Sequence, residues 1–367
     1  MTIKLAVLLS GIPVFGNENA TFFPLKVHAK QLKQEYGLEI EFFRDHRKCK
    51  EADHLLISSW YFGRKLQLWK SDKDLLFSEL EKLNQKFEKT IWFDISDSTG
   101  TTQFEVLPHI GAYWKSQLLR QLSGYERPTN SGRVFTDFYI NKWGGSADEV
   151  IEPHLVNGYE ERFSDKIKLA WNTGLGHFGM FSPYFERFDR VMPGDWTLLN
   201  YPGAAASPSL NRSRYLSCRF GTKYQRKSVS LGRSKTAEIL QNYIATNKLN
   251  RKLYFEEMKN SKLVISPFGL GEITLRDFEV FLCGAALIKP KMDHMDTWPN
   301  FYDPSLIFEY SWDLSDLDAI IDDLRHRDTE ILEKATASQR NYLKFTSGEL
   351  SGEYFCEHLM SLLTNKA

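Results

Sequence analysis

Short apolar runs alternate with longer charged stretches along the first part of the chain. The apolar runs lie at 3–9, 38–43, 54–58 and 90–93, and the stretches between them are helical in character, with one helix expected near 23–36. Runs of this length, bounded by turns, are typical of buried strands. Because strands that alternate with helices form parallel sheets, this part of the chain is predicted to be an α/β unit of Rossmann type.

The same alternation returns between residues 261 and 290. A buried strand is followed by a Pro/Gly turn, a helix over about 272–283, a glycine stop and a second buried strand. Leu275, Phe278 and Leu282 recur in the helix at three- and four-residue spacing and supply an apolar face to lie on a sheet. The segment is predicted to be a βαβ unit, which implies a second Rossmann-like domain.

Elsewhere the pattern predicts single elements. Strands are expected at 106–110, 215–218 and 306–310, and helices at 113–119, at 236–246 and from 315 onward. In the helix at 113–119, Lys115 is expected to be a solvated lysine. Between 125 and 200 the aromatic residues show no periodicity, so no element is predicted there.

Length and composition limit the classes of protein that fit. A chain of 367 residues suits two domains of roughly 150 to 200 residues. Basic and acidic residues balance at 47 each, so no overall field favours nucleic acid or an anionic membrane, although a local basic patch is allowed. No apolar run approaches the roughly 20 residues that span a bilayer, and the apolar start fits a first strand better than a signal peptide. The cysteines are widely spaced, as is typical of reduced thiols in a cytosolic protein: Cys49, Cys218, Cys283 and Cys356.

A polar turn follows the predicted strand at 90–93. Asp94 and Asp97 lie there among Ser96, Ser98 and Thr99, beyond a strand end where parallel sheets bind ligands. Asp97 is a candidate catalytic base that takes the proton of an acceptor hydroxyl. The alternatives are ordinary turn and N-cap chemistry, or a divalent metal site, for which no third carboxylate stands at regular spacing.

A glycine-rich segment at 171–179 contains His177. Its glycines permit close approach of the backbone to a ligand, and His177 is a second candidate catalytic residue, as a base or as a donor to a phosphate or sugar oxygen. A purely structural histidine in a glycine loop is the alternative.

The helix expected at 272–283 opens after a loop of small residues that includes Gly271. Such a helix end presents free backbone N–H groups and the positive end of the helix dipole, so an anion is expected there. Glu272, Arg276 and Glu279 lie on neighbouring positions of one face. Arg276 offers a planar fork of donors suited to phosphate, and Glu279 is suited to accept hydrogen bonds from the hydroxyls of a ribose. The alternative is an ordinary βαβ unit with a solvated Glu/Arg pair.

These residues carry a family resemblance. The run Ser-Lys-Leu-Val-Ile-Ser-Pro-Phe-Gly at 261–269, followed by Arg276, Glu279 and Cys283-Gly284, resembles the donor motif of GT-B-type glycosyltransferases. It is most similar to the exostosin-like and "glycosyl transferases group 1" branches, and it covers about residues 254–312.

The resemblance implies an α/β protein of two Rossmann-like domains facing across a cleft (GT-B). It also implies transfer of a sugar from a nucleotide-activated donor to a hydroxyl of a glycan or glycoconjugate, as in surface polysaccharide or glycan assembly, with no cofactor and no metal required. One position departs from the family. Retaining enzymes of this superfamily often carry two Glu eight positions apart, but eight before Glu279 stands Gly271, with Glu272 one step later, so the stereochemistry stays open.

A basic cluster at 219–227 follows the strand expected at 215–218. GT-B enzymes generally neutralise the diphosphate leaving group with Arg, Lys and a helix N-terminus, and Arg219 and Lys223 are the preferred candidates here. A solvated turn or a weak nucleic-acid patch is the alternative. The loop at 292–302 adds His294 and Asp296 as residues that could touch the sugar.

The predicted organisation has four parts. Residues 1–200 form an N-terminal domain on the acceptor side, 201–211 a linker and 212–345 the nucleotide-sugar domain. The helix at 346–367 packs back on the N-terminal domain, as GT-B proteins commonly do, with Tyr342, Phe345, Tyr354 and Phe355 as packing residues.

The predicted partners are a nucleotide sugar and a glycan acceptor, with no nucleic acid, a cytoplasmic location, and peripheral membrane contact left open. A non-catalytic nucleotide- or glycan-binding protein on a GT-B-like fold is the competing hypothesis. A dinucleotide-dependent oxidoreductase is disfavoured because the turn at 10–16 lacks the G-x-G-x-x-G spacing.

Overall fold

The structure is a computed structural model that describes residues 2–11, 17–49, 52–127, 129–130, 132–144, 153–154, 159–182 and 200–364. Most of the turn expected at 10–16 lies outside the described residues.

The first half of the chain builds a six-stranded parallel sheet. Its order is β2 (Leu38–Phe43), β1 (Ile3–Leu8), β3 (His54–Ser58), β4 (Lys89–Asp94), β5 (Ala112–Lys115) and β9 (Ile167–Leu169). Along β1, Leu5 and Val7 enter one apolar cluster and Ala6 and Leu8 the other, so the strand is buried on both faces. The strands predicted in the first hundred residues are thereby confirmed.

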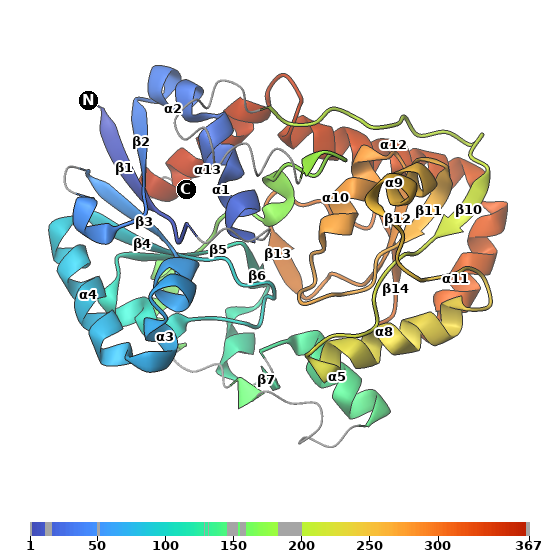
Figure 1. The fold of residues 1–367 in the computed structure, drawn as a ribbon, viewed down its shortest axis with the longest axis horizontal. Helices are drawn as coiled ribbons and strands as arrows, with labels where there is room; N and C mark the ends of the chain where they lie inside the picture. The colour runs from blue at the N-terminus through green and yellow to red at the C-terminus, as the bar shows by residue number, and fades with distance from the viewer. Residues whose placement is uncertain are drawn as a thin grey trace.

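Helices cover this sheet. They are α1 (Asn17–Val27), α2 (Ala29–Glu35), α3 (Leu68–Ser71) and α4 (Lys73–Lys86). The helix expected near 23–36 thus begins earlier and is split in two. We call the sheet and these helices the first lobe, which occupies the left of Figure 1.

Two elements of the first half differ from the prediction. Residues 104–109 form a 3₁₀ turn in place of a strand, and 112–119 form β5 and β6 (Gln117–Leu119) in place of a helix. In β5 the neighbours Tyr113 and Trp114 enter opposite apolar clusters, as in a strand buried on both faces. Lys115 is therefore not solvated: it is fully buried, with its ammonium 2.9 Å from the carboxylate of Asp94.

The second half builds a four-stranded parallel sheet. Its order is β10 (Arg214–Ser217), β11 (Ser261–Ile265), β12 (Ala286–Pro290) and β14 (Phe308–Tyr310), which confirms the predicted strands. The accompanying helices are α8 (Lys227–Leu240), α9 (Arg251–Lys259), α10 (Leu275–Leu282), α11 (Leu317–Asp323) and α12 (Asp328–Phe345). Helix α8 begins and ends earlier than the helix expected at 236–246. We call this sheet and these helices the second lobe.

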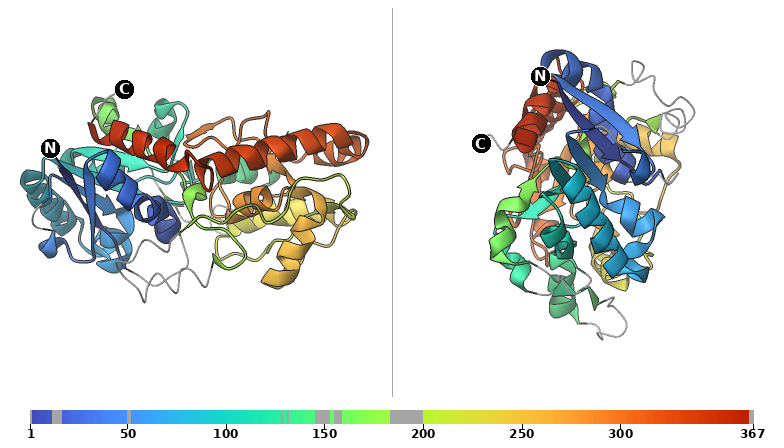
Figure 2. Two further views of the ribbon diagram at one scale, coloured as in Figure 1. Left: turned by 90° about the horizontal axis from the view of Figure 1, so that it is seen from above. Right: turned by 90° about the vertical axis from the view of Figure 1, so that its left-hand side faces the viewer.

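The lobes are joined at several points as well as by the chain between them. Strand β6 pairs antiparallel with β13 (Met295–Thr297), and α5 (Val134–Trp143), from the first half, packs on α8 (Figure 1). Helix α13 (Ser351–Thr364) returns to the first lobe (Figure 2). There the rings of Phe355 and Trp171 lie 5.1 Å apart. Within the first half of the chain, β7 (Thr129–Asn130) and β8 (Pro153–His154) pair in a short antiparallel ladder.

Two Rossmann-like α/β lobes with a pocket between them are the GT-B architecture, so the predicted fold class is confirmed. Among the described residues, no helix is long and apolar enough to cross a membrane.

Candidate functional site

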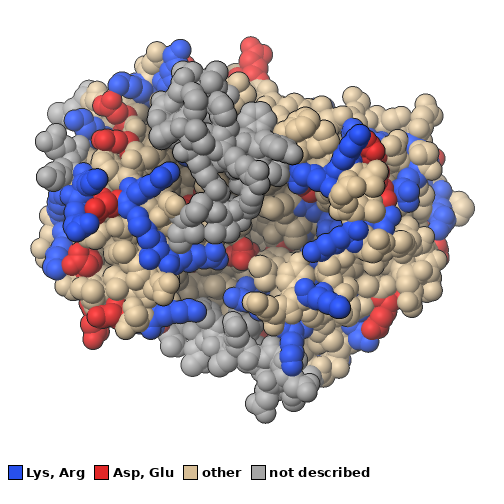
Figure 3. All heavy atoms as spheres, in the orientation of Figure 1, with Lys and Arg blue, Asp and Glu red and all other residues tan. Residues whose placement is uncertain are grey.

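A pocket of about 620 Å³ lies between the lobes. The first lobe contributes polar side chains to it, and the second lobe contributes the loops around α8, α9 and α10. Figure 3 shows lysine and arginine side chains on both sides of the middle of this face of the molecule. The lining residues are Asn17, Ser96, Asp97, Gln117, Thr173, Arg219, Phe220, Gly221, Tyr224, Arg233, Lys248, Leu249, Arg251, Tyr254, Gly269, Leu270, Gly271, Ile273, Thr274, Leu275, Arg276 and Glu279.

Helix α10 begins at Leu275, later than predicted, because Thr274 caps it. Thr274 and Asp277 form a capping box, in which each side chain bonds the backbone of the other residue. Asp277 is in turn held by the buried ammonium of Lys289 at 2.8 Å and by the Tyr302 hydroxyl at 3.0 Å. The capping box thus satisfies the backbone N–H of Thr274 and one N–H of the first helical turn, that of Asp277.

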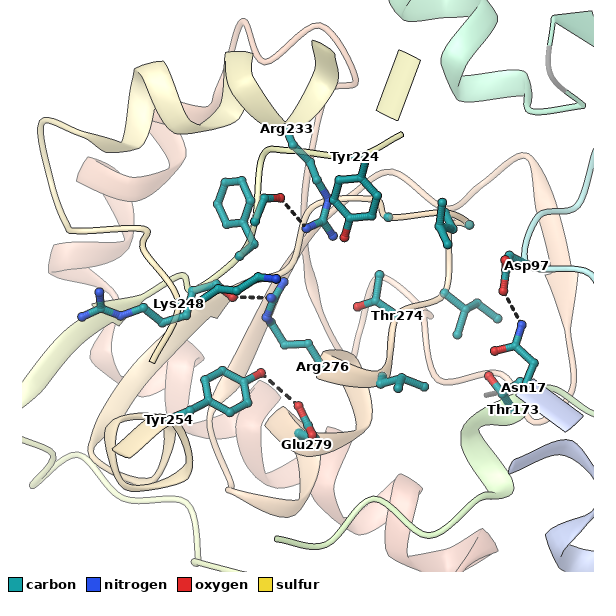
Figure 4. A pocket seen from close by; sticks show the side chains of 18 of the residues that line it. Asn17, Asp97, Thr173, Tyr224, Arg233, Lys248, Tyr254, Thr274, Arg276 and Glu279 are labelled. Atoms are coloured by element: carbon teal, nitrogen blue, oxygen red, sulfur yellow. Dashed lines mark hydrogen bonds between the residues drawn. The ribbon is translucent and has the colours of Figure 1, made fainter. Parts of the chain in front are cut away.

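Arg276 projects from the first turn of α10 into the pocket (Figure 4). Its Nη2 donates to the backbone carbonyl of Arg219, while Nε and Nη1 are buried without an acceptor in the described part of the chain. No carboxylate of a described residue lies within ion-pair distance of it. A buried guanidinium left in this state favours an anion that supplies the missing acceptors.

Arg233 of α8 is the second guanidinium at this end of the pocket, and its side chain is buried. Its Nε donates to the Phe268 carbonyl at 2.8 Å and its Nη1 to the Gly221 carbonyl at 3.1 Å, and the guanidinium lies 4.9 Å from the Tyr224 ring centre. Burial lowers the pKa of Arg233, and the nearby charge of Arg276 lowers it further.

The sequence placed Arg233 in the basic region but did not single it out. Helix α8 begins ahead of it and turns it inward, on the face that also buries Val229 and Leu240. A helix predicted to begin at Lys227 would have placed Arg233 on its buried face and so identified it as a candidate.

Glu279 lies one turn beyond Arg276 and also lines the pocket. Its carboxylate accepts a hydrogen bond from the Tyr254 hydroxyl at 3.0 Å and from Arg251 Nη1 at 3.3 Å. Burial raises the pKa of Glu279, against the lowering effect of Arg251. A carboxylate has about four acceptor positions, so Glu279 keeps capacity for ligand hydroxyls.

Of the two predicted basic donor-binding residues, Arg219 lines the pocket and Lys223 does not. The guanidinium of Arg219 forms a bidentate ion pair with Glu257, at 2.8 and 2.7 Å. Its backbone carbonyl accepts the hydrogen bond from Arg276 Nη2. Lys223 is exposed and is not a lining residue. The positive charge in the pocket comes instead from Arg276 and Arg233, with the ion-paired Arg251 and the exposed Lys248 at its border.

Asp97 is the first-lobe carboxylate that faces the pocket. Asn17, at the start of α1, donates its amide to Asp97 Oδ1 (Figure 4). Gln117 Nε2 donates to the Asp97 carbonyl at 2.8 Å. Asp94 is not available, because it is fully buried and bonded to Lys115, Tyr113 and Ser96. Of the two aspartates that the sequence analysis considered, the structure thus places only Asp97 in the lining of the pocket.

Gly271 lines the pocket and packs against the Asp97 backbone, but Glu272 does not line it. The Glu272 side chain is fully buried and accepts hydrogen bonds from Ser98 and Thr99, with His294 3.6 Å away. The predicted donor-binding role of Glu272 is corrected accordingly.

His177 and the sugar-loop candidates also lie outside the lining. His177 packs edge-on against Phe23 at 6.0 Å, and burial lowers its pKa to about 4. His294 faces Glu272, and Asp296 pairs with Arg120 at 3.1 Å. Within the described ranges, no three His, Cys, Asp or Glu side chains gather as metal ligands.

No family model and no curated protein matches the chain, so the exostosin-like or group 1 branch has no match to support it. Similar solved structures include HepE of Anabaena in complex with UDP-glucose, with 11% identity, 99% of this chain and 100% of that chain covered, and a TM-score of 0.47. Others are sucrose-phosphate synthase of Thermosynechococcus elongatus (9% identity, 99% and 100% covered, TM-score 0.44) and an alpha-glucosyltransferase in complex with UDP (10% identity, 100% of both chains, TM-score 0.42).

Proposed function

We propose that this protein is a glycosyltransferase that takes a sugar from a nucleoside diphosphate sugar bound between its lobes and transfers it to a hydroxyl of a glycan acceptor. The carrying observation is the pair of largely buried guanidiniums, Arg276 and Arg233, which enter one pocket without a carboxylate partner among the described residues.

Charge and size both support a nucleotide ligand. Two neighbouring buried cations are costly in the empty protein, and a diphosphate offsets that cost with charge-assisted hydrogen bonds. A volume of about 620 Å³ falls in the range of small-molecule sites. Glu279, held by Tyr254 and Arg251, is suited to bind the ribose hydroxyls.

The arrangement also suits the chemistry of transfer. Asp97 approaches the pocket from the first lobe, opposite the guanidiniums of the second (Figure 4). In the proposed step Asp97 takes the acceptor proton, the acceptor oxygen bonds to the anomeric carbon, and the bond from that carbon to the diphosphate oxygen breaks. Arg276 and Arg233 stabilise the charge on the leaving diphosphate, a form of electrostatic catalysis that does not require a metal.

The finer assignments belong to the same proposal. They are a role in surface polysaccharide or glycan assembly, a cytoplasmic location and metal-independent transfer. A non-catalytic nucleotide- or glycan-binding protein is the second candidate. Asp97 favours the enzyme, because nucleotide binding alone gives no reason for a carboxylate on the opposite wall of the pocket.

Thermal-shift measurements with UDP, GDP, CMP, ADP and dTDP test the donor site. A nucleotide at 100 times its dissociation constant should add about 2.7 kcal/mol of stability. Transfer and donor hydrolysis are then measured with the sugars of the nucleotide that binds. The enzyme hypothesis expects Asp97→Asn to bind this nucleotide as the wild type does and to lose transfer. Binding without turnover in the wild type would favour the second candidate. No binding of any of the five would overturn the proposed transfer and leave only the glycan-binding form of the second candidate.

A further inference from the structure

Glu272 belongs to the second lobe but makes its hydrogen bonds with the first. Its Oε1 accepts from the hydroxyls of Ser98 at 3.0 Å and Thr99 at 2.7 Å, and its Oε2 accepts from the backbone N–H of Thr99 at 3.2 Å. The side chain has no exposed surface, and His294 Nε2 lies 3.6 Å from Oε1. A buried carboxylate with three donors is satisfied only in this position.

The segment that Glu272 holds is the loop that carries Asp97. Ser98 and Thr99 follow Asp97 directly in the chain. Gly271, which precedes Glu272, packs so tightly on this loop that a Cβ atom there would lie 1.6 Å from the Asp97 carbonyl oxygen. Two consecutive residues of the second lobe therefore fix both the backbone of Asp97 and the residues just after it.

The same two residues lie just before the start of α10. Thr274 caps the helix, and Arg276 projects from its first turn. The Asp97 loop is thus tied, through Glu272, to the segment that aims Arg276 into the pocket. A shift of one loop changes the spacing between the carboxylate and the guanidinium.

Glu272 is not needed to keep the lobes together. Strands β6 and β13 pair across the lobes, and the Asn172 amide donates to the Thr297 hydroxyl at 2.6 Å and to the Trp298 carbonyl at 3.1 Å. The Tyr342 hydroxyl donates to the Gly174 carbonyl at 3.1 Å. Loss of Glu272 should therefore loosen the Asp97 loop without separating the lobes.

We propose that Glu272 is a positioning residue that fixes the Asp97 carboxylate at the distance from the donor-binding guanidiniums at which an acceptor hydroxyl is activated. The role of Asp97 in this statement rests on the function proposed above, whereas the tie between Glu272 and the loop does not. Glu272 touches neither the sugar nor the nucleotide, because its oxygens are buried and occupied.

Hydrogen exchange tests the tie independently of activity. In Glu272→Gln an NH2 donor replaces one of the two accepting oxygens, so either the Thr99 N–H or the hydroxyls of Ser98 and Thr99 lose their acceptor. The peptide that spans 97–101 should therefore exchange at least about tenfold faster than in the wild type. Glu309→Gln is the matched control, since Glu309 is a half-buried second-lobe glutamate bonded to the Met292 N–H and lies outside this pocket. Unchanged exchange at 97–101 in Glu272→Gln would overturn the proposal.

Kinetics test the positioning. We expect Glu272→Gln to lower kcat by up to about 100-fold, as for a reacting group displaced by about 1 Å, while nucleotide affinity stays within about twofold of the wild type. Glu272→Asp, which keeps the charge, should recover part of kcat, and Glu309→Gln should match the wild type. Weakened nucleotide binding in Glu272→Gln, or a normal kcat, would overturn the positioning role. If the wild type binds no nucleotide, the proposed function fails, and the exchange result still decides whether Glu272 holds the loop.

Discussion

Gly271 lies against Asp97 so closely that the two loops have no room for a side chain between them. A Cβ atom on Gly271 would stand 1.6 Å from the carbonyl oxygen of Asp97 and 2.4 Å from its carbonyl carbon. The atoms it would meet are mainly backbone, so they cannot rotate away as the end of a flexible side chain does. The contact joins the predicted acceptor side of the protein to the predicted donor side at one point.

We therefore expect Gly271→Ala to force these loops apart and to lower the free energy of unfolding by about 1–3 kcal/mol, as overpacking of a dense interior does. Urea denaturation measures the change. The control is Gly203→Ala, where an added Cβ has no atom within 4 Å and the effect should stay below about 1 kcal/mol. Equal stability of the two variants would show that the loops are not in contact.

The buried ion pair of Lys115 and Asp94 predicts a larger loss. Both side chains are fully buried, 2.9 Å apart, so Lys115→Ala leaves an uncompensated charge inside the first lobe and should cost about 3–5 kcal/mol. Lys142→Ala also removes an ion pair, at 3.4 Å from Asp313, but Lys142 is exposed, so its loss should cost less than about 1 kcal/mol. Denaturation midpoints compare the two, and a Lys115→Ala variant as mild as Lys142→Ala would contradict the buried pairing.

The same pair shows how far sequence reasoning reaches. Strands at 38–43 and 54–58 were predictable because a strand buried on both faces must be a continuous apolar run. The strand that ends at Lys115 was assigned to a helix, because a lysine after two aromatic residues resembles a solvated helix position. Only the parallel register of β4 and β5, which places Asp94 beside Lys115, makes the lysine a buried one.

In the candidate site too, some residues were predictable from local sequence and others depended on long-range packing. Asp97 was predicted from its place after a strand end, and Arg276 and Glu279 from their places in the first two turns of a helix, where local sequence fixes the geometry; all three line the pocket. Glu272 was misplaced because its partner, Thr99, is 173 residues away and is brought near only by the packing of the lobes. Local spacing located the residues, but long-range packing assigned them their partners.

Loss of Arg276 should affect nucleotide binding more than stability. Arg276→Met removes a guanidinium with two unbonded buried nitrogens, so we expect nucleotide affinity to fall by about 10–100-fold, the loss of one charge-assisted contact. The free energy of unfolding should stay within about 1 kcal/mol of the wild type, because the charge that burial penalises is gone together with its bond to the Arg219 carbonyl and its attraction to Glu279. Calorimetric titration and urea denaturation measure the two quantities.

Arg340→Met is the control for Arg276→Met, since Arg340 lies exposed on α12 away from the pocket. It should bind nucleotide as the wild type does. If Arg276→Met is strongly destabilised while its nucleotide affinity is normal, Arg276 is a structural residue and the donor site lies elsewhere.

The pH dependence of unfolding should report on Glu272. Burial alone would raise the pKa of Glu272, but the nearby His294, 3.6 Å away, and the hydrogen bond from Thr99 lower it from 4.5 to about 2. A carboxyl whose pKa is depressed in the folded state stabilises the protein above its unfolded pKa and loses that contribution as the pH falls. About 3 kcal/mol should therefore disappear between pH 4.5 and pH 2, because each tenfold change in proton affinity corresponds to about 1.4 kcal/mol.

Other carboxyl groups titrate in the same pH range, so Glu309→Gln serves as the control. Burial raises the pKa of Glu309, so folding disfavours its charged form. Its contribution to stability therefore increases on acidification, whereas that of Glu272 decreases. Urea unfolding measured from pH 6 to pH 2 should thus give a shallower loss of stability for Glu272→Gln than for the wild type. For Glu309→Gln the loss on acidification should be as steep or steeper, because this variant lacks a group that gains stability on protonation. Parallel curves for Glu272→Gln and the wild type would mean that the carboxylate is not held by Thr99 and His294 in solution, and the tie between the lobes at that point would be lost with it.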